Sequence, residues 1–230
     1  MGSLYYYGKL NLIINGAAIL ILSGIIVYTS LYRKRGKPED KAYFALIITN
    51  IITAAVNGLP YIMTAVDFQF GDMPYKVVYT AYFVCYNLFC MFWSLYLVYR
   101  MKWTGTKLKI GIIVFGLPAF IMAVISLVNL NSFGIIDAIV HLPGGYDVEF
   151  YYVQRYLPVI IYVICTIMIT VKIGLRVLLL FVPLFAAQCY LETVMATDIT
   201  PLFLTVYLIY AHLFAMRDAF YEEEPNYDNN

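Results

Sequence analysis

The feature that most constrains this chain is its division into apolar runs separated by short charged or polar segments. Most runs reach about 20 residues, the length that a helix needs to cross the hydrocarbon core of a bilayer. In lipid the backbone must satisfy its own hydrogen bonds, which a helix does within each segment. The sequence therefore predicts an all-α polytopic membrane protein, a bundle of seven transmembrane helices. The predicted spans are residues 10–32, 42–66, 77–99, 108–130, 156–172, 175–195 and 201–216.

The composition agrees with this class, since 63% of the residues are hydrophobic and only 13% are charged. Soluble domains have about 45–50% apolar and about 25% charged residues. The membrane domain is predicted to occupy residues 1–218, followed by an acidic, disordered tail at 219–230. The boundary between the fifth and sixth spans rests only on the short sequence KIGLR, residues 172–176.

The stretch LYRKRGKPEDKAYF, residues 31–44, carries seven charges between the first two spans. Lys and Arg are enriched in cytoplasmic loops, so their distribution predicts the orientation of the chain. With the N-terminus outside, 12 of the 15 Lys and Arg residues lie inside, and the three outside are Lys9, Lys76 and Arg155. The chain is therefore predicted to run from an outer N-terminus to a cytoplasmic C-terminus. Gly36 and Pro38 are predicted to end the first helix and permit a tight turn into the second.

One outer segment, residues 131–155, is much longer than the other connections. Its sequence LPGGYD combines proline with two glycines and is a strong turn signal. Aromatic residues follow this turn and are placed to cover the outer end of the bundle.

Polar residues inside the spans indicate either interhelical contacts or a binding site. Asn50, Thr53 and Asn57 fall on one face of the second span. The predicted topology also gathers polar and tyrosine side chains in the outer helix halves, as in many small-molecule pockets. The predicted ligand-binding residues are Asn15, Asn57, Tyr61, Tyr79, Tyr82, Arg155, Gln188 and Glu192, with Asp67 and Tyr156 nearby. Arg155 and Glu192 would pair with each other or with a charged ligand. The alternative for each Asn or Gln is an interhelical hydrogen bond, worth about 0.6–2 kcal/mol.

The sequence contains no pattern typical of an enzyme. There is no HExxH motif and no glycine-rich phosphate loop, and the two histidines, His141 and His212, are predicted on opposite sides of the membrane. The seventh span lacks the central lysine of retinal proteins. All four cysteines lie in apolar runs and are read as core residues. We therefore expect no catalytic residue, no metal and no cofactor, and the net charge of +1 gives no reason to expect nucleic acid.

Two stretches carry a family resemblance. YRKRGKPEDKAYFALIITNIITA and MFWSLYLVYRMK resemble the first inner loop and second span, and the end of the third span, of membrane sensor modules from gut Firmicutes. Those modules precede diguanylate cyclase (GGDEF) or histidine-kinase output domains. The likeness covers most of the chain as architecture, but specific residues only over about 31–52 and 91–102. It implies a bacterial inner-membrane protein, here without its output domain.

These observations predict a receptor or sensor module that binds a small ligand among the outer helix halves and signals to a cytoplasmic output. The expected partners are the lipid bilayer, an unknown small molecule, and a cytoplasmic signalling protein or an output domain once joined to the chain. The alternative is a small-solute transporter, since the nicotinamide-riboside and sugar carriers also have seven spans and a similar length. Their paired-tryptophan signature is absent, because the chain has only Trp93 and Trp103.

Overall fold

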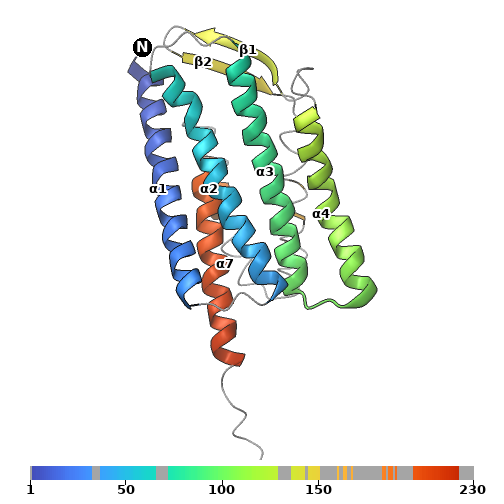
Figure 1. The fold of residues 1–230 in the computed structure, drawn as a ribbon. Helices are drawn as coiled ribbons and strands as arrows, with labels where there is room; N and C mark the ends of the chain where they lie inside the picture. The colour runs from blue at the N-terminus through green and yellow to red at the C-terminus, as the bar shows by residue number, and fades with distance from the viewer. Residues whose placement is uncertain are drawn as a thin grey trace, which may run out of the picture.

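The structure is a computed structural model of a helical bundle (Figure 1). It describes residues 2–32, 37–65, 72–128, 136–142, 145–150 and 199–222, and ten separate residues between 160 and 190. The helices are α1 (Gly2–Tyr32), α2 (Pro38–Ala65), α3 (Asp72–Arg100), α4 (Gly105–Val128) and α7 (Thr200–Glu222). Two strands, β1 (Ile136–Leu142) and β2 (Gly145–Phe150), complete the described elements.

The first four predicted spans are confirmed as helices, and all four are long and apolar enough to cross a membrane. The helices extend past the predicted spans at several ends, most of all in α1, which begins at Gly2. The reason is that hydropathy detects the lipid-facing part of a helix, whereas the hydrogen-bonded ladder continues into polar flanking residues. The four helices run alternately up and down in one layer, and α7 packs against α1 and α2 (Figure 1).

The last helix differs from its prediction at both ends. It runs from Thr200 to Glu222 and so includes residues 219–222, which the sequence analysis assigned to the tail. Within the residues searched for membrane spans, Thr200–Ala211 is an apolar helical segment shorter than a full membrane crossing. The fifth and sixth predicted spans, 156–172 and 175–195, lie largely outside the described residues. The described chain thus contains four span-length helices and α7.

The hairpin of β1 and β2 was not anticipated by the all-α prediction. The two strands pair antiparallel, with Leu142 opposite Gly145 and an irregularity between Ile136 and Ala138. The predicted LPGGYD turn therefore falls where the two strands meet. The hairpin lies at the end of the bundle that carries the N-terminus (Figure 1). The β-branched residues of IDAIVHL favour a strand beside a Pro-Gly turn, and this local preference was overlooked.

Burial follows the pattern of a membrane protein. Large apolar side chains such as Leu20 and Leu31 of α1 and Leu127 and Val128 of α4 are exposed, while many polar side chains are buried inside the bundle. Lipid provides an apolar surrounding for the former and no hydrogen bonds for the latter. This distribution supports assignment of the four long helices to a membrane.

At the end of the bundle opposite the N-terminus, short connections join α1 to α2 and α3 to α4. Pro38 opens α2, and the Lys37 carbonyl accepts hydrogen bonds from the N–H groups of Asp40 (3.1 Å) and Lys41 (3.4 Å). Proline fits the first helical position because that residue needs no N–H donor there. Between α3 and α4, Lys102 and Gly105 adopt positive φ angles of 53° and 59°. These two left-handed residues reverse the chain within a few residues.

Candidate functional site

The polar face predicted on α2 points into the bundle. Asn50, Thr53 and Asn57 are all buried. The Thr53 hydroxyl donates to the Thr49 carbonyl of its own helix at 2.8 Å. The Asn50 amide instead reaches α7, where it donates to the Pro201 carbonyl at 3.2 Å and to the Thr205 hydroxyl at 3.1 Å. For Asn50 the interhelical alternative therefore holds.

Antiparallel packing of α2 on α3 brings four predicted site residues to two adjacent levels of the bundle. The rings of Tyr43 and Tyr96 lie 5.7 Å apart and fix the register of the two helices. Asn57 follows Tyr43 in α2 by as many residues as Tyr82 precedes Tyr96 in α3. Asn57 and Tyr82 therefore lie at the same level along the bundle. Tyr61 and Tyr79 lie about one turn further toward the N-terminal end of the bundle.

We call these four residues the outer cluster, after the side of the membrane predicted for this end of the bundle. Asn57 and Tyr82 are buried, and Tyr61 and Tyr79 are half-buried. The Tyr82 ring packs edge-on against Phe83 at 5.5 Å and is stacked with Tyr86 at 6.3 Å. The outer cluster thus combines a buried amide with three tyrosines, and its role in ligand binding stays a prediction.

Asn15 lies close to this level on α1. A Cβ placed on Gly58, the neighbour of Asn57, would lie 3.4 Å from the Leu12 side chain of α1, which sets the register of these helices. Asn15 is buried and its amide donates to Asn11 Oδ1 at 2.5 Å. The amide group of Asn15 is thus held from within α1, and its oxygen Oδ1 stays available for another contact.

Gln188 is not part of α7 but lies beside its first residue, Thr200. Its amide donates to the Thr200 hydroxyl at 3.3 Å, and both residues are buried. It therefore lies nearer the middle of the bundle than the outer cluster. Arg155 and Glu192 lie outside the described residues, as do Asp67 and Tyr156. The predicted pairing of Arg155 with Glu192 stays a prediction.

Three buried asparagines retain an unused acceptor. The oxygens Oδ1 of Asn15, Asn50 and Asn87 have no hydrogen-bond partner among the described residues. A buried polar atom without a partner costs about 1–3 kcal/mol. Water or a ligand that donates hydrogen bonds would remove this cost. In the same part of the chain, no group of three or more His, Cys, Asp or Glu residues is arranged to hold a metal ion.

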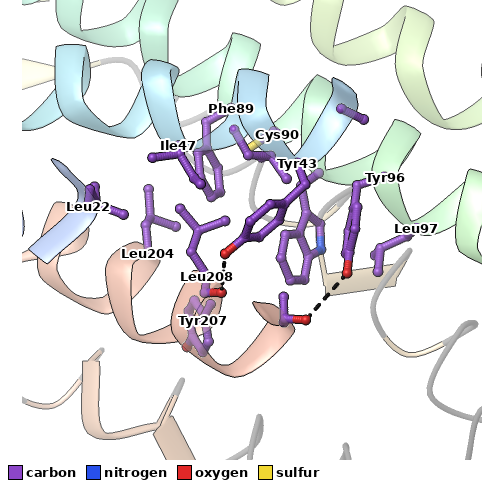
Figure 2. Close-up of a cluster of buried hydrophobic side chains, with 14 of the residues drawn as sticks. Leu22, Tyr43, Ile47, Phe89, Cys90, Tyr96, Leu97, Leu204, Tyr207 and Leu208 are labelled. Carbon is purple, nitrogen blue, oxygen red and sulfur yellow. Dashed lines mark hydrogen bonds between the residues drawn. The ribbon is translucent and has the colours of Figure 1, made fainter. Parts of the chain in front are cut away.

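Two tyrosines that the sequence analysis did not select connect α2 and α3 to α7. The Tyr43 hydroxyl donates to the Leu208 carbonyl at 3.0 Å, and the Tyr96 hydroxyl donates to the Ala211 carbonyl at 3.5 Å (Figure 2). Both tyrosines are buried within the main apolar cluster of the bundle. A seven-residue spacing on α2 relates Tyr43 to Asn50 and Asn57. This spacing was the sequence signal that Tyr43 shares their helix face.

An aromatic stripe on α3 joins the outer cluster to these contacts. Tyr82, Tyr86, Phe89, Trp93 and Tyr96 follow one another at alternating four- and three-residue steps, which places them on one helix face. The ring centroids of Phe89 and Trp93 are 6.5 Å apart, and those of Trp93 and Tyr96 are 6.0 Å apart. We call this row the aromatic stripe. Its ring contacts form two groups, Tyr82 with Tyr86 near the outer cluster, and Phe89, Trp93 and Tyr96 beside α7.

Comparison with known proteins adds no relative to these observations. No protein-family model matches the chain, and no curated protein is significantly similar to it. The function must therefore be argued from the arrangement of the residues themselves.

Proposed function

We propose that this protein is a membrane receptor or sensor module that binds a small ligand at the outer cluster and signals through α7. The observation that carries the proposal is the attachment of α7. Side chains of α2 and α3, the two helices that form the outer cluster, hold α7 by hydrogen bonds from Asn50, Tyr43 and Tyr96. At the end away from the N-terminus, α7 extends beyond the other helices (Figure 1). A shift in the packing of α2 on α3 would therefore reach that end.

We further propose that the N-terminus lies outside and the extended end of α7 lies in the cytoplasm. Most of the described Lys and Arg residues near helix ends support this orientation. Lys37, Lys41, Arg100, Lys102, Lys107 and Lys109 lie at the end where α2 begins, α3 ends and α4 begins. Only Lys9 and Lys76 lie near the opposite end. This asymmetry matches the positive-inside rule.

The chemistry of the described residues favours a ligand that donates hydrogen bonds. The outer cluster and Asn15 present side-chain amides and phenol groups. The Oδ1 atom of Asn15, which has no hydrogen-bond partner, is an acceptor. A hydroxyl or amine group of a ligand would donate a hydrogen bond to this acceptor. The apolar part of the same ligand would stack on a tyrosine ring. The ligand acts as a signal only if it binds one arrangement of the helices more tightly than the other.

The output is proposed from the resemblance of residues 31–52 and 91–102 to sensor modules that precede GGDEF or histidine-kinase domains. By that analogy α7 would drive a cytoplasmic partner or an adjoining output domain in a bacterial inner membrane. A coding sequence for such a domain next to this gene would support the assignment directly.

The ligand site is tested with purified protein in lipid nanodiscs and a defined panel of amino acids, sugars, nucleosides and polyamines. A ligand of the outer cluster should raise the thermal unfolding temperature of the wild type and lose this effect in Asn57→Leu and Tyr82→Phe. Tyr190→Phe is the matched control, because Tyr190 is exposed. Stabilisation that survives both cluster substitutions would refute the site.

A transport assay with the same ligand distinguishes the receptor hypothesis from the transporter hypothesis. A receptor binds the radiolabelled compound saturably in proteoliposomes without accumulating it. Uptake that depends on time and on an imposed gradient would instead identify a small-solute transporter, and the receptor proposal would be abandoned.

A further inference from the structure

Two buried polar side chains of α3 and α4 each retain an oxygen without a hydrogen-bond partner. Asn87 of α3 and Ser126 of α4 are each 1% exposed. The atoms Asn87 Oδ1 and Ser126 Oγ have no partner among the described residues. By contrast, the hydroxyl of Ser94, also buried, donates to the Cys90 carbonyl of its own helix at 2.9 Å. A buried serine in this bundle can thus pair within its helix, and Ser126 does not.

A glycine contact sets the register of α4 on α3. A Cβ added at Gly111 would lie 3.1 Å from Cγ1 of Val98. The two helices run in opposite directions, so each step forward along α4 corresponds to a step back along α3 (Figure 1). Ser126 follows Gly111 by as many residues as Phe83 precedes Val98. Ser126 and Phe83 therefore lie at the same level along the bundle.

Both side chains belong to the faces on which α3 and α4 pack together. Around α4, the position of Ser126 falls between those of Gly111 and Gly116, and both glycines lie against side chains of α3. On α3, Asn87 precedes Met91 by one turn, and Met91 is among the residues that a Cβ at Gly116 would meet. Ser126 and Asn87 thus both project into the interface between the two helices.

The amide of Asn87 has a defined orientation. Its nitrogen Nδ2 donates to the Phe83 carbonyl at 2.8 Å. Because a carbonyl only accepts, this contact identifies the nitrogen and leaves Oδ1 on the side of the amide away from that carbonyl. The amide group therefore lies over the turn at Phe83, which is the level of Ser126. Asn87 Oδ1 and Ser126 Oγ are brought across the interface from each other, yet they do not bond directly.

We propose that one water molecule binds between α3 and α4 and bridges Asn87 to Ser126. The water donates one hydrogen bond to Asn87 Oδ1 and accepts another from the Ser126 hydroxyl. It donates its second hydrogen to the Met122 carbonyl, since a helical carbonyl has two lone pairs and the backbone N–H uses only one. Ala123, on the same buried face as Ser126, contributes only a methyl group beside the site.

The chemistry of the site favours water over an ion. Helix α3 carries no charged residue between Lys76 and Arg100, and α4 carries none after Lys109. An ion would be buried there without a counter-charge, which is costly. Buried waters typically make about three hydrogen bonds to polar groups that otherwise lack partners. The site is also separate from the outer cluster, because Tyr82 lies on the opposite side of α3 from Met91. This inference is therefore independent of the proposed receptor function.

The water is tested by solid-state NMR of the full chain in lipid bilayers, with magnetisation transferred from water protons to labelled asparagine side chains. We expect transfer to the Asn87 amide although that side chain is buried. Ser126→Ala removes one of the three partners of the water and should lower this transfer by half or more. Ser94→Ala, the matched control, removes a buried hydroxyl that is bonded within α3 and should leave the transfer unchanged. Absence of transfer to Asn87 in the wild type would overturn the site, as would equal transfer in the wild type and Ser126→Ala.

A double-mutant cycle tests the bridge by a second measurement, the equilibrium constant of unfolding. Once Asn87→Leu has removed one partner of the water, Ser126→Ala has less left to lose. The double variant should therefore raise the unfolding constant by less than the product of the two single effects, by at least about twofold. Asn87→Leu combined with Ser94→Ala should give the full product, and a full product in both pairs would overturn the bridge. If Asn87→Leu does not fold, the NMR comparison of the wild type, Ser126→Ala and Ser94→Ala decides alone.

Discussion

The packing of α4 on α3 depends on a glycine with no room for a side chain. A Cβ added at Gly111 would lie 2.9 Å and 3.0 Å from Cζ3 and Cε3 of Trp103, and 3.1 Å from Cγ1 of Val98. These distances are shorter than ordinary van der Waals contacts between carbon atoms. The indole is a large rigid ring and Val98 is buried, so neither moves easily. Gly111→Ala therefore forces α4 away from α3 or displaces Trp103.

The size of the effect follows from two opposing contributions. Overpacking a well-packed interior costs about 1–3 kcal/mol. Replacing a glycine by alanine inside a helix gains about 0.5–1 kcal/mol, because alanine has less backbone freedom to lose. Gly16→Ala in α1 makes the same gain without a clash, because nothing lies within 4 Å of its Cβ. The helical contribution cancels between the two variants, so Gly111→Ala should be less stable than Gly16→Ala by about 1–3 kcal/mol.

The comparison is made by reversible unfolding in mixed micelles, followed by circular dichroism. Both variants are read against the wild type, and Trp103→Ala is introduced into each background. Removal of the ring should recover most of the loss in Gly111→Ala, because two of its three close contacts are indole atoms. Equal stability of Gly111→Ala and Gly16→Ala would refute the packing argument.

Four further outcomes are expected. Gly116→Ala should cost less than Gly111→Ala in the same assay, because its closest contact is the mobile end of Leu95 at 3.3 Å; an equal loss would contradict this. Lys102→Gly should raise stability by about 0.5–1 kcal/mol, since φ is 53° there and glycine adopts positive φ without strain; a lower unfolding temperature would argue against it. Asn50→Asp should destabilise the protein by about 2.5 kcal/mol or more at neutral pH, because it puts a charge near the middle of the bundle, and wild-type stability would disprove the expectation. In a cysteine-free background, a membrane-impermeant maleimide should label Met73→Cys in intact cells and Lys37→Cys only after permeabilisation, and the reverse pattern would invert the proposed orientation.

The long helices could be predicted because the bilayer imposes one length on every apolar run. The prediction failed where another force decides. At the start of α1 the chain stays helical from Gly2 although its tyrosines and Lys9 lower the hydropathy. Residues 219–222 continue α7 although they are polar and aromatic. The hairpin of β1 and β2 depends on local β propensity and a turn, and neither appears in a count of spans.

The candidate site was predictable only in part, for a similar reason. Topology alone assigns residues to one half of the bundle. In the structure Asn57 and Tyr82 share a level, and Tyr61 and Tyr79 lie about one turn further along. Topology does not say which tyrosine touches which helix. The chain has 23 tyrosines, so their number alone gave no reason to select Tyr43 and Tyr96 as residues that contact α7. The seven-residue spacing on α2 and α3 carried that information, because residues at this spacing stay on one helix face.

Helices α4 and α7 are held in the bundle by different kinds of contact. Helix α4 meets α3 through close contacts at Gly111 and Gly116, so sliding along α3 would drive larger side chains into those places. Helix α7 is held by side chains that donate to its backbone carbonyls, at Leu208 and Ala211, and to its side-chain hydroxyls, at Thr200 and Thr205. Close van der Waals contacts at two glycines therefore fix the position of α4, whereas hydrogen bonds to α7 contribute to fixing its position.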